Sequence, residues 1–120
     1  MSRYSIITPT LNCGNKVERT LRSVLGQKCA DYEYLIVDGG STDDTPAIAS
    51  RVAEVNHRVE VVSEPDYGIY DAINKGISRC NGEVVCILHA GDVYYDFTLE
   101  NIDRCYRDRP SSQQFALAAS

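Results

Sequence analysis

The chain has 120 residues and a mass of 13.3 kDa, which is room for one domain with a single hydrophobic core. Its 43% apolar and 24% charged residues are typical of a soluble globular protein and exclude wholesale disorder. The net charge of −5 and the pI of about 4.9 argue against a nucleic-acid groove. A phosphorylated ligand would therefore need a metal cation between the acids of the protein and its phosphates.

Strand and helix signals alternate from the start of the chain. A β-prone run from Tyr4 to Thr8 is expected to stop at Pro9, because proline cannot donate to a sheet ladder. A helix should follow, with Asn15 as its N-cap, Glu18 as the partner in a capping-box variant and Gly26 as its stop. Its apolar positions recur at helical spacing: Val17, Leu21, Val24 and Leu25.

The second strand is expected from about Glu33 to Val37 and the third from Val59 to Val62. Between them, Thr45-Pro46 provides the N-cap and first turn of a second helix. The run from Glu83 to Leu88 is almost wholly apolar, which predicts a central parallel strand buried on both faces.

Two more helices complete the alternation. The third has apolar residues at positions i, i+3, i+4, i+7 and i+8, and the fourth is expected from Thr98 to Arg107. A polar break from Pro110 to Gln114 precedes Phe115 to Ala119, which would begin another strand. The pattern predicts an α/β fold with a mostly parallel sheet. The inward residues of the two helices are Ile69, Ala72, Ile73, Gly76 and Ile77, then Leu99, Ile102 and Tyr106.

Cysteine usage and hydropathy indicate the compartment. None of the five cysteines forms a C-x-x-C pair, and an odd count suits a reducing compartment better than a disulfide framework. Cys86, inside an apolar run, is expected to be a small core residue. No signal peptide is visible, and the longest apolar run, Val84 to Leu88, is too short to cross a bilayer. We expect a cytoplasmic protein, with peripheral association at the inner membrane as a second option.

Polar residues follow each expected strand. Because the carboxyl ends of parallel strands lie on one side of a sheet, four segments should converge on one crevice: Thr8 to Asn12, Asp38 to Gly40, Glu64 to Asp66 and His89 to Asp92. Such an edge is where open α/β sheets bind ligands. The sequence therefore predicts a ligand site containing several carboxylates.

Each carboxylate also has a structural interpretation. Asp38 alone would be as readily a helix cap or an Asx-turn residue as a ligand contact, and only the convergence favours contact. For Asp43 and Asp44, close to a helix N-terminus, the structural interpretation is preferred. Asp71 and Lys75 form an ordinary i, i+4 pair, although Asp71 also lies in the first turn of its helix and faces the same edge.

The segment after the fourth strand holds the best candidate for a metal ligand. Asp92 follows a buried strand and two small residues, whereas His89 is more often a solvated loop residue than a ligand. Four tyrosines could stack on a base or a sugar, but tyrosine at loop edges is also common packing: Tyr67, Tyr70, Tyr94 and Tyr95.

With these residues placed, the sequence resembles the nucleotide-sugar-binding half of a family 2 glycosyltransferase with the GT-A fold. The resemblance covers Tyr4 to about Tyr95 and implies a three-layer αβα, Rossmann-like architecture. It is highly specific when all segments are taken together and weak for any one of them. The matching segments are Ser5 to Asn12, Val37 to Thr45, Glu64 to Ile77 and Leu88 to Asp92.

The resemblance also implies which residues bind the donor. Thr8 to Thr10 would line the base pocket, Asp38 would contact the base, and the Asp66 to Lys75 segment, chiefly Asp71, would border the diphosphate-sugar. Asp92 would be the last acid of the family's D-x-D-type motif and would hold Mg²⁺ or Mn²⁺ against the diphosphate. The implied donor-binding set is Thr8, Pro9, Thr10, Asn12, Asp38, Gly39, Asp66, Asp71 and Lys75.

The implied reaction is transfer of a sugar from a nucleotide-diphosphate sugar to an acceptor hydroxyl, with the metal neutralising the leaving group. Members of the family usually invert the anomeric configuration with a carboxylate general base. The acceptor would be a carbohydrate or a lipid-linked molecule, as in the biosynthesis of cell-envelope polysaccharides.

This sequence departs from the family pattern in two ways. Ala90 stands where the motif often has its first acid, and His89 stands where Asn is frequent, which would alter metal affinity or donor choice. The chain also stops near the point where the acceptor-binding half should begin, so no residue is assigned as the general base. We expect a donor domain over residues 1–110 and a tail or further strand over residues 111–120. An exposed sheet edge would allow a homodimer.

Two other functions are compatible with the sequence. The chain could be a binding module that retains affinity for a nucleotide-sugar without turnover, or a truncated product that needs a partner. A generic α/β domain without a ligand is disfavoured by the convergence of four polar segments on one edge.

Overall fold

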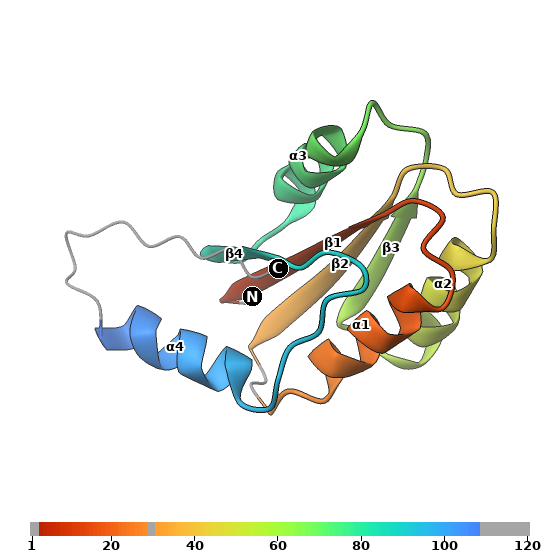
Figure 1. The fold of residues 1–120 in the computed structure, drawn as a ribbon. Coiled ribbons are helices and arrows are strands. Elements are labelled where there is room, and N and C mark those ends of the chain that lie inside the picture. The colour runs from red at the N-terminus through yellow and green to blue at the C-terminus, as the bar shows by residue number, and fades with distance from the viewer. Residues whose placement is uncertain (1–2, 29–30, 109–120) are drawn as a thin grey trace.

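The computed structural model describes residues 3–28 and 31–108, which form a parallel sheet in the order β3-β2-β1-β4 with helices on both faces (Figure 1). Every strand pair is parallel, so the expected α/β class is confirmed. In chain order the elements are β1 Tyr4–Thr10, α1 Lys16–Leu25, β2 Tyr32–Asp38, α2 Thr45–Val55, β3 Val59–Ser63, α3 Ile69–Arg79, β4 Val84–Ile87 and α4 Thr98–Asp108.

The two faces of the sheet are covered unequally. Figure 1 shows α3 alone on one face and α1, α2 and α4 on the other. The larger core cluster joins one set of strand residues, such as Ile6 and Ile36, to those three helices, whereas the smaller cluster joins Ile7, Leu35 and Val37 to Ala72 of α3. This gives the three-layer αβα arrangement. Cys86 belongs to the larger cluster, as expected.

Pro9 lies inside β1, where it pairs with Val37, so the prediction that the strand stops at Pro9 is wrong. The Thr10 carbonyl accepts a hydrogen bond from Gly39 on the β2 side, and adjacent residues of a strand direct their backbone groups to opposite sides. The nitrogen of Pro9 therefore faces the β4 side. The pairing of β1 with β4 already ends at Ile7, so no ladder bond is lost there.

The expected central position of β4 is also wrong for the residues that the structure describes, because β4 lies at the edge of their sheet. Val84 and Cys86 are buried against the larger core cluster, whereas Val85 and Ile87 on the α3 side are only half-buried. An apolar run predicts burial of side chains, but it does not specify how many neighbouring strands supply it.

The helix ends are close to their predicted positions, but their hydrogen bonds differ. Asn15 is the N-cap of α1 without a side-chain cap bond, and Glu18 pairs instead with Arg22 (2.8 Å). The N-cap of α2 is Asp44 rather than Thr45, whose backbone N–H donates to Oδ1 of Asp43 (3.0 Å). The structural interpretation of Asp43 is therefore confirmed. Gly26 ends α1 as predicted.

The two later helices use their apolar faces to different extents. In α4 the predicted inward residues Leu99, Ile102 and Tyr106 are all buried. In α3 the buried residues are Ala72 and Gly76, while Ile69 and Ile77 remain 46% and 47% exposed. The expected strand over residues 115–119 and the tail over residues 111–120 lie outside the described residues. No helix within residues 3–28 and 31–108 is long and apolar enough to span a membrane.

Candidate functional site

The loops that follow the first three strands are tied together at the carboxyl edge of the sheet. The N–H of Gly39 donates to the carbonyl of Thr10 (2.9 Å), and the N–H of Glu64 donates to the carbonyl of Asp38 (3.0 Å). These backbone bonds join the ends of β1, β2 and β3. They bring together three of the four polar segments that were predicted to converge on this edge.

Asn12 and Thr45 close the loop after β1 onto the loop after β2. The side-chain oxygen of Asn12 accepts a hydrogen bond from the N–H of Thr42 (2.8 Å), and its own N–H donates to the hydroxyl of Ser41 (2.8 Å). The hydroxyl of Thr45 accepts from the N–H of Cys13 (3.0 Å). The polar groups of Asn12 are therefore used in contacts between the two loops.

Asp38 is fully buried, and both of its carboxylate oxygens are occupied by donors from the protein. The hydroxyls of Thr10 (2.7 Å) and Ser63 (3.0 Å) donate to it from β1 and β3. The N–H groups of Gly40 (3.1 Å) and Ser41 (2.8 Å) and the hydroxyl of Ser41 donate from the turn. Because a carboxylate has about four lone-pair sites, Asp38 is saturated in this arrangement. Its contacts within the turn are those of an Asx-turn.

The same contacts determine the charge state of Asp38. Burial acts to raise the pKa of Asp38, but the hydrogen bonds from Ser41, Thr10 and Ser63 outweigh it and hold that pKa below its usual value. Asp38 is therefore a buried anion stabilised by its donors. It joins three strand ends into one unit.

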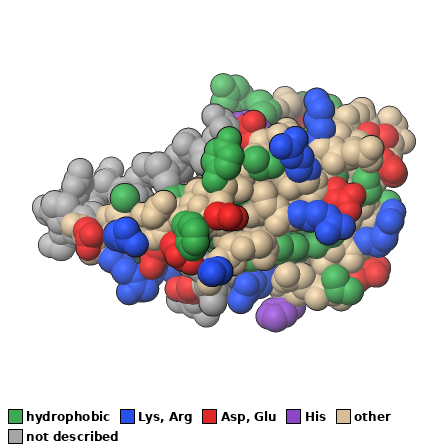
Figure 2. All heavy atoms as spheres, turned by 60° about the horizontal axis from the view of Figure 1, so that its bottom comes forward, with side chains coloured by type: hydrophobic (Ala, Val, Ile, Leu, Met, Phe, Trp, Pro, Cys, Tyr) green, Lys and Arg blue, Asp and Glu red, His purple; other side chains and the backbone are tan. Residues whose placement is uncertain are grey.

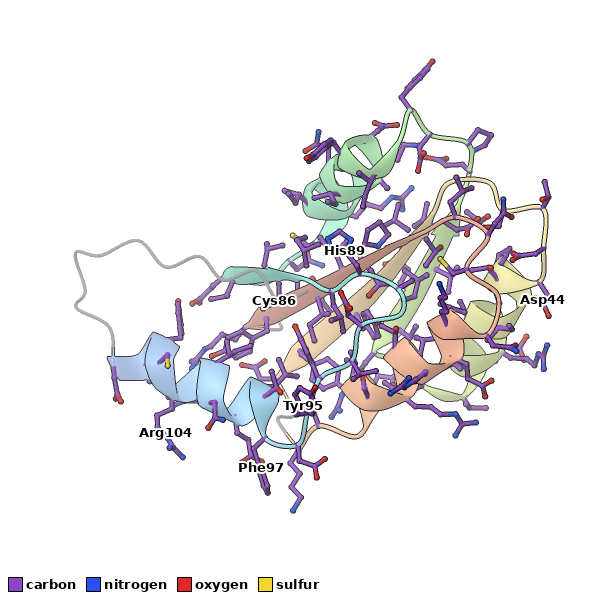
Figure 3. The ribbon with its side chains drawn as sticks, viewed as in Figure 1. Asp44, Cys86, His89, Tyr95, Phe97 and Arg104 are labelled. Atoms are coloured by element: carbon purple, nitrogen blue, oxygen red, sulfur yellow. The ribbon has the colours of Figure 1, made fainter. Side chains whose placement is uncertain are left out.

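A hollow of about 280 Å³, here called the α3 hollow, lies where the loop after β1, the start of α3 and the segment after β4 meet. Gly39 makes room for Asp66 at its wall, because a Cβ at Gly39 would lie 2.6 Å from a carboxylate oxygen of Asp66. His89 lies on the α3 side of the sheet (Figure 3). The lining residues are Pro9, Thr10, Leu11, Cys13, Asp66, Gly68, Ile69, Ala72, His89 and Ala90.

A wider hollow of about 510 Å³, here called the α1 hollow, shares Ala90 with the α3 hollow. It brings the N-terminal turn of α1 against the segment after β4. Lys16 and Arg19, which contribute two positive charges, form no ion pair within residues 3–28 and 31–108. The lining residues are Asn15, Lys16, Arg19, Ala90, Gly91 and Asp92.

The carboxylate of Asp92 differs from that of Asp38. It lines the α1 hollow and accepts no hydrogen bond from any residue in the described part of the chain, although its N–H donates to the carbonyl of His89 (3.0 Å). Its oxygens are therefore available to a cation or to a ligand with hydrogen-bond donors. Of the two aspartates, Asp92 is the one with free binding capacity.

The sequence analysis missed a polar row, formed by Thr20 and Ser23 of α1 and by Gln27 just after its C-cap, that holds the segment carrying Asp92. The hydroxyl of Thr20 binds the backbone at Gly91 and Asp92, the hydroxyl of Ser23 accepts from Tyr94 N–H (3.1 Å), and Gln27 binds the carbonyl of Tyr95 (2.8 Å) and the N–H of Leu99 (2.9 Å). The signal was present in the sequence. Polar residues at i, i+3 and i+7 beside the apolar stripe of a helix indicate a partner with free backbone groups.

The structure places the predicted donor-binding residues in four kinds of position, the last of which is on α3 outside the hollow. Pro9, Thr10 and Asp66 line the α3 hollow, with Gly39 directly behind Asp66. Thr8 and Asp38 are buried and line neither hollow; the hydroxyl of Thr8 contacts that of Tyr34 (2.7 Å), which belongs to the larger core cluster on the sheet face opposite α3. Asn12 is in the loop contacts described above, and Asp92 lines the adjoining α1 hollow.

Asp71 and Lys75 lie on α3 next to the α3 hollow, outside its lining. They form the expected i, i+4 ion pair (3.7 Å), and Asp71 also accepts the N–H of Tyr67 (2.9 Å). Lys75 additionally donates to the carbonyl of Pro65 (3.0 Å) and pairs with Glu64 (3.3 Å). The pair therefore braces the loop from Glu64 to Tyr67, which carries Asp66 to the hollow.

The four tyrosines divide between core and surface. Tyr94 is buried and belongs to the larger core cluster, whereas Tyr67, Tyr70 and Tyr95 are at least 79% exposed. On the face turned forward in Figure 2, basic and acidic side chains are interspersed, and hydrophobic side chains occur singly or in small groups.

Comparison with known proteins shows where this arrangement recurs. The family model described as glycosyl transferase family 2 matches residues 5–104. The chain is 39% identical over 94 residues to a PGL/p-HBAD biosynthesis glycosyltransferase of Mycobacterium bovis, covering 78% of this chain and 37% of that protein. It is 35% identical over 88 residues to chondroitin synthase of Pasteurella multocida, covering 73% of this chain and 9% of that protein.

Two solved structures share the fold. The mannosyltransferase PcManGT from Pyrobaculum calidifontis, in complex with GDP-Man and Mn²⁺, superposes with a TM-score of 0.82 at 29% identity, over 88% of this chain and 32% of that one. TarS of S. aureus, in complex with UDP-GlcNAc, superposes with a TM-score of 0.82 at 23% identity, over 90% and 32%. The TarS match concerns the fold alone. The chain thus spans about a third of the length of the mycobacterial relative and of both these structures.

Proposed function

This chain belongs to glycosyl transferase family 2, and on that premise we propose that it binds the nucleotide-sugar donor in a metal-dependent transfer of sugar to an acceptor hydroxyl. One observation carries the proposal: a free carboxylate, that of Asp92, lines the α1 hollow, which adjoins the α3 hollow at Ala90. The likeness to a mannosyltransferase in complex with GDP-Man and Mn²⁺ supports it.

The two hollows suggest how the donor is arranged. We assign the nucleoside to the α3 hollow, where Pro9 and Thr10 present one wall and Asp66 and His89 offer polar groups. Thr8 and Asp38 do not line this hollow and act indirectly: Asp38 accepts hydrogen bonds from the hydroxyl of Thr10 and from the N–H of Gly40. Asp71 and Lys75 contribute by bracing the wall that carries Asp66.

The diphosphate would extend past Ala90 toward Asp92 and the α1 hollow. Lys16 and Arg19 line that hollow without a carboxylate partner in the described residues, so their charges are available to offset those of the phosphates. This assignment explains how an acidic chain can accept a doubly charged group. The basic residues are few, but they lie next to the acid that would hold the cation.

The residues present fit a divalent cation bound jointly by protein and substrate. The described residues contain no group of three or more His, Cys, Asp or Glu side chains able to enclose a metal ion, and Asp92 offers a carboxylate with free oxygens. Mg²⁺ in particular is usually bound by one or two carboxylates together with substrate phosphates. When bound, the cation would neutralise the charge that develops on the departing nucleoside diphosphate.

The reaction also requires an acceptor and a general base. We propose an inverting transfer in which a carboxylate general base activates the acceptor hydroxyl. No described residue is assigned that role. We propose a carbohydrate or a lipid-linked molecule as the acceptor; family membership supports this, and no contact in the described residues is used for it.

Ligand-induced stabilisation tests the donor and metal assignments together. We expect UDP or GDP to raise the melting temperature, and to raise it further with Mn²⁺, because a ligand at a hundredfold excess over its Kd adds about 2.7 kcal/mol to the free energy of unfolding. Asp92→Asn should remove the Mn²⁺-dependent part of the shift. Asp96→Asn, a loss of one exposed carboxylate outside both hollows, should leave it unchanged.

An Asp92→Asn protein that retains the full Mn²⁺-dependent shift would refute the metal assignment. No shift with either nucleotide, with or without Mn²⁺, would refute donor binding. Incubation with a nucleotide-sugar then separates the two functional classes. Release of nucleoside diphosphate marks an enzyme, and stabilisation without turnover marks a binding module or a domain that needs a partner.

A further inference from the structure

The backbone on either side of the Gly91–Asp92 peptide is bound by one side chain of α1. The N–H of Gly91 donates to the hydroxyl of Thr20 (2.9 Å), and the same hydroxyl lies 2.8 Å from the carbonyl of Asp92, to which it donates. The carboxylate of Asp92 has no partner of its own in the described residues. The point from which that carboxylate extends is therefore set by how its backbone is held.

A hydroxyl is suited to this position because it can accept one hydrogen bond and donate another. Thr20 is fully buried, so water does not replace its contacts. A helical threonine commonly donates to the carbonyl four residues earlier, here that of Lys16 at 3.1 Å, and this is the alternative for its single proton. The shorter contact is the one to Asp92.

The segment held by Thr20 has high intrinsic freedom. Gly91 has a φ of 98°, in the region that favours glycine, and glycine restricts its flanking peptides least of all residues. The side chain of Lys16 lies close by, with its Cδ 3.6 Å from the position of a Cβ at Gly91. The N–H of the peptide between Gly91 and Asp92 bonds to the His89 carbonyl within the turn, and the Thr20 hydroxyl adds an anchor from α1 on either side of that peptide.

We propose that Thr20 is a positioning residue that orients Asp92 toward the cation and diphosphate. The inference deepens the proposed function and rests on it. Thr20 touches neither donor nor cation, since it is buried and lines neither hollow. It acts through the peptide that carries Asp92, as groups behind metal ligands commonly do.

The test compares isosteric and conservative variants of the intact chain. Thr20→Val removes the hydroxyl and keeps the shape, whereas Thr20→Ser keeps the hydroxyl. The measurement is the affinity for GDP and UDP with and without Mn²⁺, together with the affinity for the free nucleosides. We expect Thr20→Val to weaken the Mn²⁺-dependent affinity at least tenfold, the usual lower bound for loss of a group behind a metal ligand. Thr20→Ser should stay close to wild type.

Two controls separate positioning from general loosening. Ser23→Ala deletes another hydroxyl of α1 that holds the same segment, at Tyr94 rather than at Asp92, and should leave the Mn²⁺-dependent affinity unchanged. Nucleoside affinity should be unchanged in all variants, because Thr20 and Ser23 do not line the α3 hollow. If Thr20→Val does not fold, the pair Thr20→Ala and Thr20→Ser differs by the hydroxyl alone and gives the same comparison.

Three results would overturn the inference. Unchanged Mn²⁺-dependent affinity in Thr20→Val, with only a lower melting temperature, would show that the hydroxyl is merely structural. An equal loss in Ser23→Ala would show that the segment loosens as a whole. A wild-type chain without any Mn²⁺-dependent binding would contradict the proposed function itself, and the inference with it.

Discussion

Two aspartates at the same sheet edge have opposite hydrogen-bond states. Asp38 is buried and receives donors from β1, β3 and its own turn, whereas the carboxylate of Asp92 has none among the described residues. An acid that already satisfies its oxygens contributes to stability, and an acid that does not is available for binding. Asp38 is thus held within the fold, whereas the carboxylate of Asp92 is free among the described residues.

Asp38 should make the protein sensitive to acid. Its pKa in the folded state is lowered, while in the unfolded state it is near the ordinary value of about 3.9, so the stabilisation is complete above that value. It is lost as the pH falls from about 4 through the folded-state pKa. We expect the urea midpoint to fall over this range, and to fall less steeply in Asp38→Asn.

Asp38→Asn should also cost about 2–3 kcal/mol at neutral pH, because an amide cannot accept every bond that the carboxylate accepts. Asp44→Asn, an exposed carboxylate without a side-chain cap bond, is the control and should change neither quantity. Identical acid profiles for Asp38→Asn and wild type would show that other carboxylates with lowered pKa values, such as Glu33 or Asp103, dominate the transition.

The sequence could nominate both aspartates but could not separate them. Both follow strands, and both precede or follow small residues. Saturation of Asp38 depends on Thr10 and Ser63, which are distant in sequence and reach it only when β1, β2 and β3 are in register. The local sequence pattern around Asp38 does not specify how the strands pair. The sequence therefore could not decide whether Asp38 is an Asx-turn residue or a ligand contact.

At the scale of elements, α3 shows how packing overrides local preference. Gly76 lies mid-helix, where glycine is unfavourable by about 1 kcal/mol relative to alanine. A Cβ at this position would lie 2.8 Å from Cγ2 of Ile7, so the glycine permits α3 to approach β1 closely. The sequence predicted Gly76 on the inward face of α3 but not the reason for a glycine there.

Gly76→Ala should therefore destabilise the protein by about 1–2 kcal/mol, because overpacking against Ile7 exceeds the gain in helix propensity. In an Ile7→Ala background the same change should become neutral or stabilising, which a double-mutant cycle in urea would measure. Asn74→Ala, on the exposed face of α3, should stabilise slightly in both backgrounds. A cost for Gly76→Ala that does not depend on residue 7 would contradict the packing explanation.

Helix α1 shows the complementary limit of sequence reasoning. Its bounds and its apolar stripe followed from periodicity and from Gly26. The row of Thr20 and Ser23, with Gln27 just beyond the helix, contacts backbone groups from Gly91 to the first turn of α4, and the sequence does not show which backbone groups the row will meet. Helices could therefore be located from the sequence, while the loop that α1 holds could not.

At the scale of the molecule, the two faces of the sheet are covered unequally: one face, here the thick side, is covered by three helices, and the other, the thin side, by one. Three helices pack on one face, and α3 alone packs on the other (Figure 1). The alternation of elements was sufficient to predict a parallel α/β fold, because each crossover places the next strand in the same direction. The alternation was not sufficient to predict the position of β4, because the apolar composition of a strand does not distinguish an edge strand from a central strand.

The unequal cover predicts unequal costs of truncation. Ile36 is fully buried on the thick side and Ile87 is half-buried on the thin side. We expect Ile36→Ala to lower the free energy of unfolding by about 3–4 kcal/mol and Ile87→Ala by about 1–2 kcal/mol. Equal costs in urea titrations would contradict this. If they also depended on protein concentration, a second copy would be covering Ile87.

Pro9 has a consequence for how the sheet can grow. It lies where β1 continues beyond its last pairing with β4, beside the α3 hollow, and it presents no amide hydrogen on that side. A further strand that pairs with this edge of β1 would therefore lack one backbone hydrogen bond at Pro9. The ring of Pro9 thus keeps the edge of β1 beside the α3 hollow from pairing at this residue, whereas a non-proline residue at position 9 would present an amide hydrogen to which a further strand could pair.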